Sequence, residues 1–153
     1  MQDVNELRNV AAEAGIISTL IHYPDYIFQS DMLQPRCFFE NDNGLIYYAI
    51  SQLIKIDNVK TIDAYNIMMV LNKSKATENP KTITVESLNS FIENSSSLMR
   101  NSPEEYKLLA DTVIDLYNRR KTYTELRNCE NLLFDDKIEN VALEISNRID
   151  NVA

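Results

Sequence analysis

The chain has 153 residues, of which 44% are hydrophobic, and it carries a formal net charge of −8 at pH 7. This hydrophobic content supports a folded core and excludes wholesale disorder, and the length fits one domain, or one domain with an appended hairpin. The acidic balance argues against a main contact with nucleic acid, because phosphate binding requires clustered Lys and Arg, and it favours a basic protein as partner.

The first hundred residues predict a series of helices and no strand, because no segment alternates steadily between apolar and polar residues. The first helix is expected from about Val4 to His22. Within it, we expect Gly15 to make a close helix contact and His22 to cap the helix end rather than to act in catalysis. Pro24 begins a short second helix. The run Asn41-Asp42-Asn43-Gly44 predicts a loop.

Three further helices complete the predicted head. The first covers residues 45–54 and is closed by Asp57-Asn58, the second opens at Thr61-Ile62-Asp63, and the third runs over residues 84–94. The polar segment Lys73–Lys81 lies between the last two helices and predicts a surface loop.

Residues 102–153 predict two long helices folded against each other. Ser102 can cap the first helix, Pro103 suits its first position, and Glu105 completes a capping box. Asp135-Asp136 is expected to break the chain and to cap the second helix. Each helix carries an apolar stripe at three- and four-residue spacing, formed by Tyr106, Leu109, Ala110, Val113, Leu116 and Tyr117 in the first and by Ile138, Val141, Ala142, Ile145, Ile149 and Val152 in the second. Because two helices cannot bury both stripes by themselves, we expect the hairpin to dock on another subunit or on the rest of the fold.

The predicted architecture is therefore all-α, with a globular helical head over residues 1–101 and a helical hairpin over residues 102–153, together one structural domain. The candidate interface for another subunit or partner consists of Leu109, Val113, Leu116, Tyr117, Arg119, Arg120, Ile138, Val141 and Ile145. The basic cluster Arg119-Arg120-Lys121 is either a solvated face or a contact for an acidic surface on a partner. The sequence leaves both interpretations open.

Scarce residue types argue against several kinds of functional site. The two glycines are far apart and cannot form the Gly-rich phosphate loop of an NTPase or a dinucleotide-binding enzyme. The single histidine, without a Cys or His cluster, argues against a zinc site or a Ser-His-Asp triad. We therefore expect no catalytic residue, no cofactor and no metal in this chain.

The sequence also predicts a cytoplasmic protein. No apolar run approaches the roughly 20 residues that span a bilayer, and residues 1–22 lack the features of a secretion signal. Cys37 and Cys129 are predicted to be buried reduced thiols rather than a disulfide, which suits the cytosol.

Several short motifs occur in order along nearly the whole chain. They are the Ala-Glu helix Ala12–Ile21 leading into Tyr23-Pro24, the Leu-x-Pro-x-x-Phe-aromatic motif in Leu33–Phe39, the Ile-aromatic-x-Ala-apolar motif in Asn43–Ile50, the helix start Ile62-Asp63, and Ala110, Val113 and Arg120 in the hairpin. This order resembles the amino-terminal domain of replicative DNA helicases of the bacterial and phage DnaB type. The departures are Ser18 for a glycine of the family, Asn43 for a histidine, and the Lys73–Lys81 segment for a Gly-Gly-x-x-Tyr motif. They fit a divergent, phage-encoded member.

The resemblance implies an all-α head with a hairpin that pairs between subunits, so that the pairs close into a hexameric ring above an ATPase motor. It implies that this collar docks primase or a helicase loader, and that the domain itself binds duplex DNA little. The motor of an ATP-dependent 5′–3′ helicase would lie beyond Ala153, because the chain ends partway along an apolar helix pattern and is expected to be a fragment. The alternative is a free-standing helical adaptor, a loader or an inhibitor, that binds a helicase collar.

Overall fold

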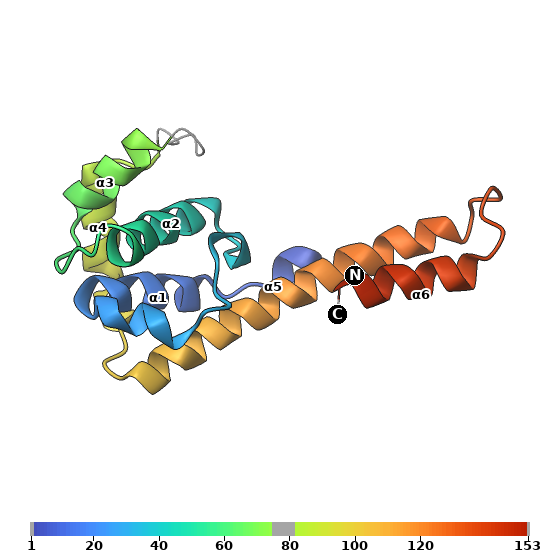
Figure 1. Ribbon diagram of the computed structural model, residues 1–153, viewed down its shortest axis with the longest axis horizontal. Helices are drawn as coiled ribbons and strands as arrows, with labels where there is room; N and C mark the ends of the chain where they lie inside the picture. The colour runs from blue at the N-terminus through green and yellow to red at the C-terminus, as the bar shows by residue number, and fades with distance from the viewer. Residues whose placement is uncertain (1, 75–81, 153) are drawn as a thin grey trace. The chain divides into compact units, whose positions relative to one another are not determined.

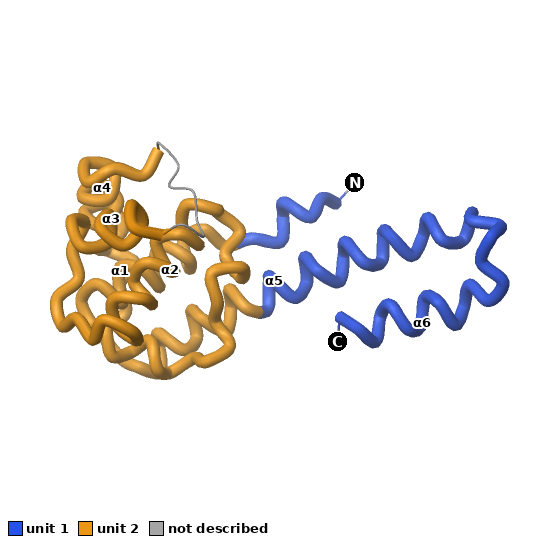
Figure 2. Tube along the Cα trace, turned by 45° about the horizontal axis from the view of Figure 1, so that its top comes forward, with its two compact units in different colours: residues 1–8, 115–153 blue, residues 9–114 orange. Residues whose placement is uncertain are grey.

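The computed structural model describes residues 2–74 and 82–152, and these residues form helices and turns (Figure 1). No strand occurs in either described range, so the predicted all-α fold is confirmed. The loop expected over 73–81 lies outside the described residues from residue 75 onward. The chain divides into two compact units (Figure 2), which we call the head unit, residues 9–114, and the hairpin unit, residues 1–8 with 115–153.

The expected boundary between residues 101 and 102 lies just before the longest helix, α5 (Pro103–Leu132). The two compact units meet within this helix, between residues 114 and 115, so α5 contributes its first turns to the head unit. Ser102 caps α5 as predicted, because its hydroxyl oxygen accepts a hydrogen bond of 3.1 Å from the backbone N–H of Glu105.

The head unit is built around the helix α1 (Val10–His22), in which residues 12–20 are all buried. Against it pack η2 (Pro24–Gln29), α2 (Asn41–Lys55), α4 (Val85–Ser95) and η4 (Ser96–Leu98), while η3 (Pro35–Cys37) and α3 (Ala64–Lys73) pack against α2. A Cβ atom on Gly15 would lie 3.0 Å from the carbonyl oxygen of Leu98 and 3.1 Å from Cδ1 of Leu109. The predicted close contact at Gly15 is therefore confirmed.

The first helix starts later than the sequence predicts. A short 3₁₀ helix, η1 (Val4–Glu6), precedes it, and α1 begins only at Val10. The physical reason is the side chain of Asn9, whose Oδ1 accepts a hydrogen bond of 2.9 Å from the N–H of Ala12. Asn9 thereby becomes a helix N-cap, with non-helical backbone angles that separate α1 from the preceding segment.

The loop predicted over residues 41–44 is wrong, because these residues form the first turn of α2. A buried carboxylate from α1 holds this turn. The Glu13 side chain accepts hydrogen bonds from the N–H of Phe39 at 2.7 Å, the N–H of Glu40 at 3.2 Å and Nδ2 of Asn43 at 3.2 Å. These bonds satisfy donors at the helix start, where the helix dipole also favours a negative charge. A tertiary contact thus overrides a local loop signal.

The other helix starts in the head unit follow local capping chemistry. Asp63 and Asn66 form a capping box at the start of α3, and Thr84 and Ser87 form one at the start of α4. Asn58 has a positive φ of 54° just after α2 and ends that helix where the sequence predicts.

The hairpin unit contains η1, the later part of α5, a link over residues 133–140 and the helix α6 (Val141–Val152). α6 runs back alongside α5 (Figures 1 and 2). The first helix ends at Leu132, just before the predicted break at Asp135-Asp136, and this pair does not cap the second helix. The cap is Asn140, whose Oδ1 accepts a hydrogen bond of 3.1 Å from the N–H of Leu143. An ion pair of 3.7 Å between Arg148 and Glu125 joins the two helices.

Candidate interaction surface of the hairpin unit

The hairpin unit buries very few of its side chains. Among its described residues, Cys129 is the one buried side chain, with 4% of its surface exposed. The predicted stripe residues of this unit are half-buried except Ala142, which is exposed. Four other large apolar side chains are also exposed, namely Leu126 (51%), Leu133 (59%), Phe134 (88%) and Leu143 (56%). Burying one such side chain fully contributes roughly 1.5–3 kcal/mol, so covering this surface is favourable.

The predicted interface residues fall into two groups. Leu109 and Val113 belong to the head unit, where Leu109 contacts the Gly15 region and Val113 is 2% exposed. The others share the hairpin unit, with Leu116, Tyr117, Arg119 and Arg120 on α5, Ile138 in the link, and Val141 and Ile145 on α6. In this second group the apolar side chains are half-buried, which leaves part of each available to a partner.

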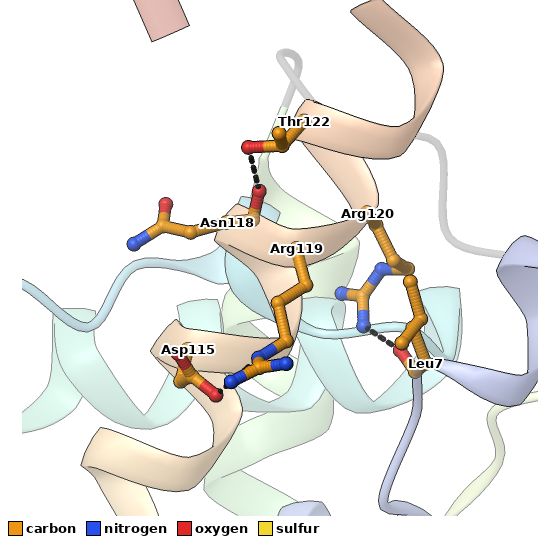
Figure 3. A network of polar contacts seen from close by, with 6 residues as sticks. All are labelled: Leu7, Asp115, Asn118, Arg119, Arg120 and Thr122. Carbon is orange, nitrogen blue, oxygen red and sulfur yellow. Dashed lines mark hydrogen bonds and ion pairs between the residues drawn. The ribbon is translucent and has the colours of Figure 1, made fainter. Parts of the chain in front are cut away.

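The side chains of Arg119 and Arg120 have different contacts (Figure 3). Nε of Arg119 lies 2.8 Å from Oδ2 of Asp115, one helical turn away, and both side chains are exposed. Nη1 of Arg120 instead donates a hydrogen bond of 2.7 Å to the carbonyl oxygen of Leu7. Arg120 therefore holds the N-terminal segment, residues 2–8, against α5. The sequence did not reveal this role, because the two residues are 113 positions apart.

An apolar groove runs along one face of α5 beside the N-terminal segment. It has a volume of about 400 Å³ and is lined by Leu7, Asp115, Asn118, Arg119, Thr122, Tyr123 and Leu126. The positions on α5 recur at three- and four-residue spacing, which is why they share one face. Leu7, Tyr123 and Leu126 supply large apolar side chains, while Asp115 and Arg119 supply a paired acid and base.

Two further basic side chains lie over aromatic rings on the same stretch of α5. Nζ of Lys121 lies 5.1 Å from the ring centre of Tyr117, and Cζ of Arg127 lies 5.6 Å from that of Tyr123. A hydrogen bond with the Tyr123 side chain, helped by the charge of Glu130, raises the pKa of Arg127. Like any arginine, this side chain stays protonated, and it places a positive charge next to the groove.

The remaining polar features have structural roles. Nδ1 of His22 lies 2.9 Å from the carbonyl oxygen of Ser18 at the end of α1, as expected for a helix-end contact. Cys37 and Cys129 are buried thiols that form no disulfide, as predicted. Over residues 2–74 and 82–152, no group of three His, Cys, Asp or Glu side chains could hold a metal ion. No helix in the described part of the chain is both long enough and apolar enough to cross a membrane.

Comparison with protein families decides the family of the chain. The family model that matches is described as the DnaB-like helicase N terminal domain, and it covers residues 5–111, well over half of the chain. The chain belongs to this family. No curated protein matches the chain. The resemblance inferred from the short motifs is thus confirmed at the level of the domain.

Within this DnaB-like domain, the match extends over the head unit and ends at residue 111, before the hairpin part of α5. The motifs that support the resemblance have physical roles in the head unit. Glu13 holds the start of α2, and Gly44 lies so close to η3 that a Cβ atom there would be 2.8 Å from the carbonyl oxygen of Pro35. Family membership therefore rests on the head, whereas the interaction surface is argued from the hairpin unit itself.

Proposed function

We propose that this DnaB-like domain is the collar of a hexameric replicative DNA helicase and that its hairpin unit pairs subunits during ring assembly. The observation that carries the proposal is how few side chains that unit buries. Among its described residues, Cys129 is the one buried side chain. Two helices in contact cover only one side of each apolar stripe. A second hairpin would convert the pair into a four-helix arrangement with a core of its own.

The residues proposed for this core come from both helices. Leu116 and Tyr117 on α5 and Val141 and Ile145 on α6 are half-buried, and Ile138 extends the surface into the link. Arg119 and Arg120 flank it with positive charge, which tunes approach and specificity more than affinity. Leu109 and Val113 support the head unit, so changes there test folding rather than pairing.

We further propose that the collar docks primase or a helicase loader, and that ATP-dependent unwinding resides in a motor outside this chain. The support is membership of the helicase family together with the formal charge of −8, which suits a basic protein surface. The same charge predicts weak binding to duplex DNA.

Sedimentation equilibrium of the full chain, from low to high micromolar concentration, tests subunit pairing. We expect reversible self-association, and we expect Ile145→Asp to weaken it because the new charge would be buried in an apolar contact. Ser146→Asp is the matched control, since Ser146 is the exposed neighbour on the same helix and should associate like the wild type. A wild-type chain that stays monomeric over the whole range would refute pairing by the hairpin.

A further inference from the structure

The link between α5 and α6 presents a large apolar ring to solvent. Phe134 is 88% exposed and its neighbour Leu133 is 59% exposed. The link is nevertheless ordered by hydrogen bonds, from the N–H of Phe134 to the carbonyl of Asn131 at 3.2 Å and from the N–H of Lys137 to Oδ1 of Asp135 at 3.1 Å. The backbone that carries the ring is therefore a hydrogen-bonded turn, which presents Phe134 as an apolar knob.

The link and the groove carry opposite charges. Residues 133–140 contain three carboxylates and one lysine, a formal charge of −2. The α5 side of the groove, residues 115–126, contains Arg119, Arg120 and Lys121 against Asp115 and Glu125, a formal charge of +1. The chain thus has an apolar knob beside an acidic link, and an apolar groove whose α5 side carries a net positive charge of opposite sign.

The knob cannot enter the groove of its own chain. From residue 121, near the middle of the groove, α5 continues for eleven residues to Leu132, which separates the two features by about 17 Å of helix. Figure 2 shows the link at the opposite end of α5 from the N-terminal segment within the hairpin unit. A second copy running antiparallel brings the link of each chain to the groove of the other, which gives a two-fold, self-complementary contact.

We propose that Phe134 of one copy inserts into the groove that Leu7, Tyr123 and Leu126 line on a second copy, with the acidic link against the basic cluster. This inference rests on the proposed pairing of hairpins and identifies the contact that sets its register. It also gives the N-terminal segment a role, because Arg120 fixes Leu7 as one wall of the groove. The pairing surface then includes residues 2–8 in addition to the two hairpin helices.

A charge-swap experiment with the full chain tests the proposed register. One variant carries Arg119→Glu with Lys121→Glu and leaves Arg120 in place, and the other carries Asp136→Lys with Glu139→Lys. Each variant alone should self-associate at least about tenfold more weakly than the wild type, because like charges then meet at both contacts. An equimolar mixture should regain wild-type association as a heterodimer, because both of its contacts are complementary. A mixture no tighter than the separate variants would overturn the proposal.

The apolar part of the contact is tested by Phe134→Ser, with Phe28→Ser as the matched control. Phe28 is exposed to 57% in η2 of the head unit and so undergoes the same change outside the proposed contact. We expect Phe134→Ser to weaken self-association by about tenfold or more and the control to leave it unchanged, with the circular dichroism of both like the wild type. Wild-type association of Phe134→Ser would refute the knob while leaving hairpin pairing intact. A monomeric wild type would instead refute pairing itself.

Discussion

Replacing Glu13 by Gln probes the contact that holds α1 to the start of α2. The substitution keeps the shape of the side chain but exchanges one acceptor oxygen for an N–H₂ group. In the wild type Oε2 accepts from the N–H of Phe39 at 2.7 Å, while Oε1 accepts from the N–H of Glu40 and from Nδ2 of Asn43, both at 3.2 Å. The best orientation of Gln keeps the two bonds at Oε1, so a donor then faces the N–H of Phe39.

The expected loss of stability in Glu13→Gln follows from the lost hydrogen bond and from the burial of the side chain. Glu13 is 1% exposed, so water cannot replace the missing acceptor. A hydrogen bond to a charged group contributes about 1.5–3 kcal/mol, and an unsatisfied buried donor costs about 1–3 kcal/mol. Removing a buried charge recovers part of this, because a carboxylate without a cationic partner is costly to desolvate. We therefore expect Glu13→Gln to lower the free energy of unfolding by about 2–3 kcal/mol.

Urea unfolding followed by far-ultraviolet circular dichroism measures this change, provided that the slope with denaturant concentration is the same for both proteins. Glu93→Gln is the matched control, since it makes the same chemical change at an exposed position of α4 and should stay within about 0.5 kcal/mol of the wild type. If Glu13→Gln is equally neutral, the carboxylate does not hold the start of α2 and the explanation of that helix start fails.

Three further outcomes are expected. Arg120→Ala should raise hydrogen exchange in the N-terminal segment, because the bond to Leu7 is lost, whereas Arg119→Ala should not. Gly44→Ala should lower the free energy of unfolding by about 1–3 kcal/mol in urea, because its Cβ would meet a backbone carbonyl oxygen at 2.8 Å. Val113→Asp should unfold the head unit, which circular dichroism would record as a loss of helical signal. A helical signal equal to that of the wild type would show that this side chain is not part of the core.

The sequence predicts those parts of the fold that depend on near neighbours. The cap at Ser102 and the helix starts at Asp63 and Thr84 lie where the sequence predicts them, because in each case the cap and its partner are three residues apart and one short stretch contains the whole interaction. The start of α2 is predicted wrongly because the side chain that holds it, Glu13, lies about thirty residues earlier. No local pattern can reveal a bond that only the tertiary fold creates.

The candidate interaction surface could likewise be predicted only in part from the sequence. Helical spacing locates the apolar stripes, but it does not say whether a side chain meets its own core or a partner. Val113 and Leu116 lie on one stripe, yet the first is buried in the head unit and the second is half-buried in the hairpin unit. Phe134 could have been noticed as a large apolar residue between two helices and beside two aspartates. The role of Arg120 depends on a contact with Leu7 that the sequence does not signal.

The two cysteines offer a way to follow each unit separately. Cys37 lies in the head unit and Cys129 in the hairpin unit, and both are buried thiols outside any disulfide. A thiol reagent can react with such a side chain only when local opening exposes it, so the labelling rate at each cysteine reports the opening of its own unit. For events in the hairpin unit, Cys129 is the reporter and Cys37 is the internal reference. An event confined to that unit would change the labelling rate of Cys129 and leave that of Cys37 constant.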